Sequence, residues 1–267
     1  PLLPSNLKLE SSTSITNFTF NQPLPSGSYA AKYWIKTPAA EFAGNDTLYT
    51  TFHVRSEYPA PYFNDFESTC NTDFLFSGEN RVWEIGTPDY NNVNAFSGIK
   101  CAATNLDTTL LTHLPSSPFA GEILWSPIIN GLDTLHHTEI RFKHTFDFTS
   151  LTRRYGQVQI WDDGKWNTLY DRNISGKNWV NLMSPLREGF VNNSNGWVQS
   201  SYPLHNYKHP GGKIFRFVSN GESGSWWAID DFEIYVPKQN SAAPLALKFV
   251  SGVPKVGNNT IIGSFFD

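Results

Sequence analysis

Two short acidic segments lie far apart in the chain and share one pattern. The first is Phe63–Glu67 and the second is Trp227–Ile234. In both, large apolar residues alternate with acidic ones, and this is the period of a half-buried β-strand. Because the first and last strands of a closed sandwich are often neighbours, we expect the carboxylates of both segments to meet at one sheet edge. Oxygen ligands gathered in this way suit Ca²⁺. The pattern therefore predicts one closed domain with a cation site.

Other residue types that serve catalysis occur without the spacing that catalysis needs. His205 and His209 lie in a Pro- and Gly-containing segment that indicates a loop, and no Glu accompanies them as in a zinc-peptidase helix. Asp162 and Asp163 precede Gly164, and this order is typical of a turn. A Gly-x-Ser-x-Gly nucleophile motif is missing from the sequence. We therefore predict no catalytic residues and expect the chain not to be an enzyme.

The tryptophans suggest a second kind of chemistry, because flat aromatic faces can stack on sugar rings. Trp161, Trp197 and Trp226 are the candidates for ligand contact, while core packing is expected for most of the others. Trp226 and Trp227 are adjacent, so their side chains point to opposite faces of a strand. One of these two should therefore be more exposed than the other.

The composition is that of an all-β extracellular protein. Charged residues make up only 16% of the chain, and the net charge is −4. An average soluble domain has roughly 25% charged residues. Since the sequence has no basic patch, we do not expect nucleic-acid binding. It also has no run of about 20 apolar residues, so we expect no membrane insertion.

Strand patterns separated by Gly, Asn and Pro turns run through the whole chain, and no stretch shows sustained helical periodicity. This predicts an antiparallel sandwich or barrel. Short Pro-containing linkers at residues 56–61 and 237–244 divide the chain into three parts. The clearest predicted strands are Tyr29–Ile35, Thr47–Val54, Val82–Ile85, Glu139–Phe148, Gln157–Trp161, Lys213–Val218, Leu245–Val250 and Thr260–Phe266.

The central block, residues 62–236, resembles MAM-like jelly-roll domains of secreted Bacteroidota proteins, including the cleaved-adhesin domains of gingipains. Residues 1–57 resemble the end of an immunoglobulin-like module of the CARDB type. Residues 240–267 look like the first strands of a further β module, or strands that complete the N-terminal one. The segments that carry the central resemblance are Phe63–Glu67, Val82–Pro88, Ala95–Gly98, Thr104–Leu106, Leu124–Pro127, Phe142–His144, Asp162–Trp166, Ile214–Phe217 and Trp227–Asp231.

The resemblance implies a two-sheet antiparallel β-sandwich with a structural Ca²⁺. It places Asp65, Glu67 and Asp231 near the cation, with Asp107 as a further candidate. The alternative is that these carboxylates only cap edge strands and accept hydrogen bonds. The resemblance also implies burial of four tryptophans, namely Trp83, Trp125, Trp166 and Trp227.

The two cysteines, Cys70 and Cys101, could form a disulfide in a secreted chain, although the sequence alone does not establish the pairing. Two thiols are too few for a structural zinc site.

The resemblance implies a non-catalytic, adhesin-like segment of a large secreted or cell-surface bacterial protein. We interpret the chain as a piece of a longer secreted polypeptide. Gliding or surface colonisation through type IX secretion is the setting that the resemblance implies. Its partners would be a glycan or protein surface and the neighbouring modules of the same polypeptide. The alternative is an accessory domain of a secreted hydrolase such as a metallopeptidase.

Overall fold

The structure is a computed structural model in which every regular element of the described residues is a β-strand. It describes residues 24–34, 47–68, 73–78, 82–89, 94–106, 119–148, 155–170, 176–179, 182–184, 187–221, 225–237, 244–249 and 261–265. The chain divides into two compact units, Pro1–Ser56 and Glu57–Asp267. Within the described residues, no helix is long and apolar enough to cross a membrane.

The first unit contains one antiparallel hairpin, in which Tyr29 pairs with Phe52 and their rings stack at 5.5 Å. Its strands are β1 (Gly27–Trp34) and β2 (Thr47–Val54). The predicted strands at these positions are confirmed.

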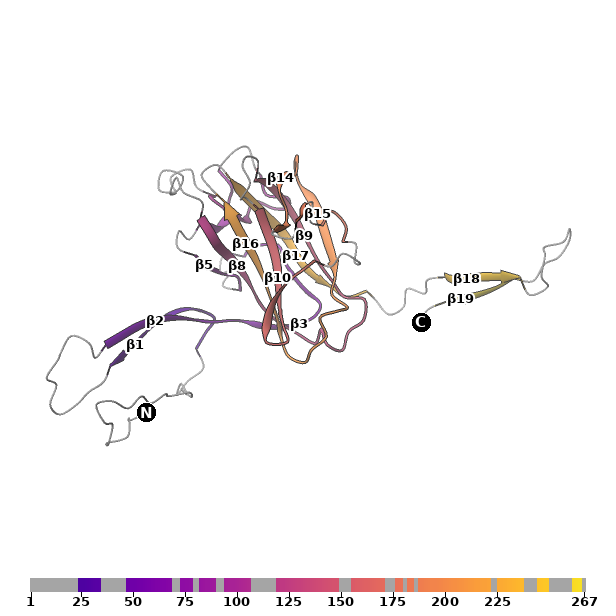
Figure 1. The fold of residues 1–267 in the computed structure, drawn as a ribbon, viewed down its shortest axis with the longest axis horizontal. Helices are drawn as coiled ribbons and strands as arrows, with labels where there is room; N and C mark the ends of the chain where they lie inside the picture. Colours follow the sequence, from indigo (N-terminus) through magenta and orange to yellow (C-terminus); the bar gives the residue numbers. More distant parts are fainter. Residues whose placement is uncertain are drawn as a thin grey trace, which may run out of the picture. The chain divides into compact units, whose positions relative to one another are not determined.

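The second unit is a sandwich of two large sheets (Figure 1). Sheet 1 has the order β11-β10-β16-β8-β3, with β5 also paired to β8. Its pairs are antiparallel except for β3 and β8, which run parallel. Its strands are β3 (Glu57–Pro59), β5 (Leu75–Ser77), β8 (Phe119–Asn130), β10 (Tyr155–Asp162), β11 (Lys165–Thr168) and β16 (Lys213–Gly221).

Sheet 2 has the order β14-β9-β17-β7-β6, with β15 beside β9 and β4 beside β17. Its strands are β4 (Tyr62–Asn64), β6 (Trp83–Gly86), β7 (Cys101–Thr104), β9 (Glu139–Phe148), β14 (Asn192–Asn193), β15 (Val198–Pro203) and β17 (Trp226–Tyr235). Two separate hairpins complete the unit, β12 (Leu182–Ser184) with β13 (Arg187–Gly189), and β18 (Pro244–Phe249) with β19 (Ile261–Phe265).

Aromatic rings fill the space between the two sheets. Phe217 of sheet 1 lies 5.1 Å from Phe142 and 5.7 Å from Trp227, both of sheet 2. All three side chains are buried, which removes large apolar surfaces from water. The strands supply these rings by alternation, as in β10, where every second residue is buried. The predicted all-β antiparallel sandwich is therefore confirmed.

The two acidic segments are neighbours, as the sequence pattern predicts, because β4 pairs with β17 through Asn64 and Phe232. The first strand is shorter than expected, however. It ends at Asn64, and Phe66 has a positive φ of 60°. Asp65 and Glu67 therefore belong to the turn that follows β4. The Asn64 side chain stabilises this turn by accepting a hydrogen bond from the backbone N–H of Phe66.

Candidate functional site

The segment Asn94–Lys100, which we call loop 94–100, is held by carboxylates from both acidic segments. Glu67 Oε1 accepts hydrogen bonds from the backbone N–H groups of Ile99 and Lys100 at 2.9 and 2.7 Å. Asp230 Oδ2 accepts from the N–H groups of Phe96 and Ser97 at 2.9 and 3.0 Å. We call Glu67, Asp230 and Asp231 the acidic clasp.

Asp231 completes the clasp from an irregular point of β17. Its Oδ1 accepts a 2.8 Å hydrogen bond from the Ser97 hydroxyl. Asp231 has a φ of 47°, and the pairing of β17 with β9 shifts register between Asp230 and Glu233. This bulge lets two consecutive aspartates reach the same loop, although regular alternation would send them to opposite faces.

Asp230 is the most enclosed member of the clasp, with no exposed surface. Burial raises the pKa of this carboxyl to about 6, and the hydrogen bonds from Ser97, Asp231 and Phe96 only partly oppose it. Lys100 contributes a nearby positive charge, but its Nζ donates to the backbone oxygen of Glu67 rather than to a carboxylate. The clasp therefore concentrates negative charge at the outer face of sheet 2.

The predicted metal ligands are only partly brought together. Glu67 and Asp231 meet at loop 94–100, whereas Asp65 is exposed and its Oδ1 accepts the N–H of Glu67 within the turn. Asp107 lies outside the described residues. Asp230 was not among the residues predicted from the sequence for this site. It is buried because loop 94–100 covers it. The adjacent carboxylates Asp230 and Asp231 were the available signal.

The negative charge of the acidic clasp suits a cation, but its carboxylate oxygens are not arranged around a common centre. The carboxylate oxygens that contact the loop accept N–H or O–H groups instead of facing a common centre. Among the described residues, no group of three or more His, Cys, Asp or Glu is arranged to hold a metal ion. The clasp as described closes loop 94–100 by hydrogen bonds, and the Ca²⁺ site stays a prediction.

Sheet 1 carries a different cluster on the face turned away from the core. Trp161 of β10 and Trp166 of β11 are register partners, with ring centroids 5.3 Å apart. The ring centroid of Trp125 of β8 lies 5.3 Å from that of Trp166. All three are partly exposed. We call these three residues the tryptophan platform. The strands β8, β10 and β16 that carry most of this face are neighbours in Figure 1.

Arg216 of β16 lies in the middle of the tryptophan platform. Its guanidinium carbon is 3.9 Å from the ring centroid of Trp166 and 5.4 Å from that of Trp125. Its Nε donates a 2.6 Å hydrogen bond to Gln159, its register partner on β10. Gln159 in turn donates to Gln157 Oε1 at 3.1 Å. The arginine is therefore held by a cation–π contact and by a chain of two glutamines.

The other two candidate tryptophans lie on sheet 2. Trp197 donates to the backbone oxygen of Asn94 at 3.0 Å, and its ring meets that of Phe96 edge to face at 5.9 Å. Trp226 is partly exposed while Trp227 is fully buried, which confirms the expected difference between these neighbours. Trp197 and Trp226 both pack on a small buried cluster around Cys101, Ala103 and Ala228.

The expected burial of four tryptophans is half right. Trp83 and Trp227 are buried, as expected. Trp125 and Trp166 are not, because both project from the outer face of sheet 1 and stay partly exposed. The expectation failed for these two because position in a motif does not tell which face of a strand is solvent-exposed. Trp125 Nε1 donates a hydrogen bond of 2.7 Å to Ser77 Oγ.

Cys101 is fully buried beside the acidic clasp, and burial raises the pKa of its thiol to about 12. Cys70 lies outside the described residues. The Cys70–Cys101 disulfide therefore stays a prediction.

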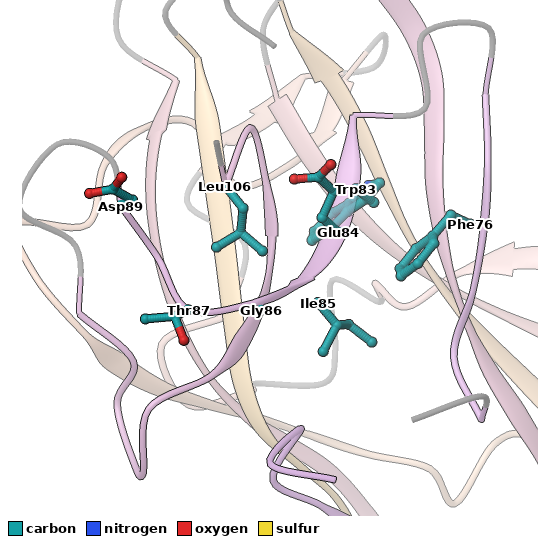
Figure 2. Close-up of a pocket in the computed structure, with 8 residues that line it drawn as sticks. All are labelled: Phe76, Trp83, Glu84, Ile85, Gly86, Thr87, Asp89 and Leu106. Atoms are coloured by element: carbon teal, nitrogen blue, oxygen red, sulfur yellow. The ribbon is translucent and has the colours of Figure 1, made fainter. Parts of the chain in front are cut away.

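An open groove runs along strand β6, which is the last strand in the order of sheet 2. Its volume is about 720 Å³. The lining, drawn in Figure 2, combines apolar side chains with two carboxylates. The lining residues are Phe76, Trp83, Glu84, Ile85, Gly86, Thr87, Asp89 and Leu106.

Three of the residues considered for catalysis, Asp162, Asp163 and His209, lie together at the end of β10. Asp162 is buried at the end of β10, and Lys213 Nζ lies 2.6 Å from its Oδ1. His209 Nδ1 lies 2.8 Å from Asp162 Oδ2. Burial raises the pKa of Asp162, but the hydrogen bonds from Lys213 and His209 outweigh this and hold it below the usual range. Asp163 has a φ of 54° and lies in the turn between β10 and β11, as predicted.

Comparison with known proteins adds distant similarities of fold. No family model matches the chain, and no curated protein matches it. Among solved structures, it is similar to the K2 cleaved adhesin domain of Lys-gingipain, with 14% identity and a TM-score of 0.41 over 66% of this chain and 100% of that one.

Two carbohydrate-binding modules have similarly low sequence identity and TM-scores. A family 61 module in complex with β-1,4-galactotriose has 14% identity and a TM-score of 0.38, covering 61% of this chain and 88% of that one. The CBM22-1 xylan-binding domain of Paenibacillus barcinonensis Xyn10C has 13% identity and a TM-score of 0.36, covering 69% and 98%. This chain thus has a distant structural similarity to an adhesin domain and to two carbohydrate-binding modules.

Proposed function

We propose that this chain is a non-catalytic, adhesin-like segment of a secreted or cell-surface protein and that it binds glycans on the outer face of sheet 1. The observation that carries the proposal is the tryptophan platform with Arg216 and Gln157 beside it. Aromatic faces bind the apolar faces of sugar rings, while amide and guanidinium groups bind their hydroxyls. Both kinds of group lie together on this sheet face.

The three tryptophans of the platform have different roles. One face of Trp166 lies under the Arg216 guanidinium, so this ring supports the arginine. Trp161 and Trp125 are both partly exposed, and the ring of each lies 5.3 Å from that of Trp166. We therefore assign sugar stacking to Trp161 and Trp125, with Trp166 as their support. The platform is built on strands, which hold such groups more rigidly than loops do.

The experiment is a titration of the protein with soluble neutral polysaccharides, β-1,4-galactan and xylan, followed by calorimetry. We expect Trp161→Ala to weaken binding by roughly tenfold or more, which is the effect of removing an aromatic anchor. Trp197→Ala on sheet 2 is the matched control and should leave binding unchanged. Equal binding by wild type and Trp161→Ala would contradict the proposal.

The groove along β6 is the competing location for a ligand. Thr87→Arg places a long side chain in that groove, and none of the groove residues belongs to the tryptophan platform. We expect this variant to bind glycans as the wild type does. Loss of binding in Thr87→Arg, with Trp161→Ala unaffected, would assign the ligand to the groove instead.

The proposal includes one structural Ca²⁺ at the acidic clasp. It is supported by three carboxylates that converge on loop 94–100. Glu67 and Asp231 would hold the ion, since each accepts hydrogen bonds from the described residues through only one of its two carboxylate oxygens. Its role would be to tie the turn after β4 to β17.

A further inference from the structure

On the basis of the proposed glycan-binding function, we propose that the tryptophan platform selects acidic glycans and that Arg216 binds the carboxylate of a uronic acid residue. The observation is a charged group placed at the centre of an otherwise uncharged aromatic surface. Among the outward-facing positions of β8, β10 and β16 that the structure describes, Arg216 is the one charged residue.

The neighbours of Arg216 on this face are apolar or neutral. Its cross-strand partners are Gln159 on β10 and Trp125 on β8. The next pairs along β16 join Ile214 to Trp161, and Val218 to Gln157. Glu57 on edge strand β3 already has a partner, because its Oε2 accepts a hydrogen bond from Asn130. The arginine therefore has no carboxylate partner of its own in the described part of the chain.

The guanidinium is also held in a defined orientation. Its plane contacts Trp166, and its Nε is used by Gln159 at 2.6 Å. These contacts leave the two terminal nitrogens, which form the fork that binds carboxylates in a bidentate manner. Among the described residues they make no hydrogen bond or ion pair. Burial lowers the pKa of Arg216, but an arginine still keeps its proton at neutral pH.

A purely structural role for Arg216 predicts something different. An arginine that served only to cover Trp166 would make no distinction between neutral and acidic polymers. Arg141 is such a case on sheet 2, because its guanidinium carbon lies 3.4 Å from the Tyr235 ring centroid while its Nε binds Glu139 at 2.9 Å. Arg141 already has its carboxylate, and Arg216 does not. This difference points to an external anion as the partner of Arg216.

The test compares three polymers on the wild-type protein by calorimetry: polygalacturonate, its methyl ester, and neutral β-1,4-galactan. Methyl esterification removes the charge and keeps the backbone, so this comparison does not depend on any variant folding. We expect polygalacturonate to bind at least about tenfold more tightly than its ester, because charge-assisted hydrogen bonds contribute more than neutral ones. The preference should also decrease with salt.

Two variants test whether Arg216 on sheet 1 is responsible for the preference for the acidic polymer. Arg216→Gln should lose the preference for the acid form and bind polygalacturonate and its ester equally, whereas Arg141→Gln, the matched control, should keep the preference. Equal binding of acid and ester, with neutral binding still dependent on Trp161, would overturn the inference and leave the proposed function intact. Absence of binding to all three polymers would overturn both. Tighter binding of a sulfated galactan than of polygalacturonate would overturn the assignment to carboxylates.

Discussion

Glu67 fills the space that a side chain at position 98 would need. A Cβ added to Gly98 would lie 2.4 Å from both Cδ and Oε1 of Glu67. Gly98 also has a φ of 58°, a conformation that residues with a side chain rarely adopt. The glycine therefore lets loop 94–100 present the N–H groups of Ile99 and Lys100 to the carboxylate at hydrogen-bond distance.

We predict that Gly98→Ala lowers the free energy of unfolding by about 2–4 kcal/mol, since it adds displacement of a hydrogen-bonded carboxylate to the cost of a positive φ. Gly131→Ala is the matched control. Gly131 has a φ of 84°, but a Cβ there would meet no atom within 4 Å, so the cost should be only about 1 kcal/mol. Denaturant unfolding measures both. Equal losses would contradict the role of Glu67.

His144 should make the protein sensitive to acid. It is fully buried, and burial lowers its pKa to about 3. Its Nδ1 lies 3.2 Å from Trp227 Nε1, and its Nε2 lies 2.8 Å from Ser200 Oγ. Because the indole can only donate, Nδ1 accepts and Nε2 carries the proton of the neutral ring. The Ser200 hydroxyl then donates to the backbone oxygen of Asn178.

The direction of the pH effect follows from the lowered pKa of His144. As the pH falls from about 6.5 toward 3, the unfolded state takes up a proton before the folded state does. The contribution of neutral His144 to stability is therefore present above pH 6.5 and is lost progressively below it. We predict that the free energy of unfolding falls between pH 7 and pH 4 by several kcal/mol more in the wild type than in His144→Asn. Parallel pH curves for the two proteins would refute this.

The sequence predicted the sandwich well where one face of a strand is buried and the other is solvated. Strand β9 has the bounds predicted for Glu139–Phe148, and β2 those predicted for Thr47–Val54. In β9 the buried residues recur at every second position over most of the strand. The pairing of β4 with β17 was also predictable, because two acidic, amphipathic segments framed the domain.

The candidate sites were less predictable, because they depend on long-range packing. Asp230 is buried only because loop 94–100, from more than a hundred residues earlier, covers it. The bulge at Asp231 has no signal in the pattern of apolar residues. The tryptophan platform joins Trp125, Trp161 and Trp166 from three strands, and their meeting depends on the sheet order. A sequence pattern predicts which face of a strand is buried, but it does not predict which strands lie next to it in the sheet.

Added Ca²⁺ should stabilise the protein if the acidic clasp binds it. A ligand at about 100 times its dissociation constant, bound only to the folded state, contributes about 2.7 kcal/mol. We predict a melting temperature several degrees higher in millimolar Ca²⁺ than in excess EDTA, with the difference lost in Asp231→Asn. Asp163→Asn, in an exposed turn, is the control and should keep it. Identical melts with and without Ca²⁺ would exclude the ion from the clasp.

The buried pair of Asp162 and Lys213 gives the last prediction. The two side chains are 4% and 2% exposed, so neither charge is compensated by water. Lys213→Leu would leave Asp162 with His209 as its remaining charged partner, and we predict a loss of about 3–5 kcal/mol in the free energy of unfolding.

The double variant Asp162→Leu/Lys213→Leu removes both charges, and the loss should be smaller than in Lys213→Leu alone, because replacing a buried ion pair by apolar groups is often nearly neutral. Denaturant unfolding of the wild type, both single variants and the double variant gives the coupling energy. If the double variant were as unstable as the two single losses added together, the pair would not be coupled. The close approach of Lys213 to Asp162 would then not be what secures the end of β10.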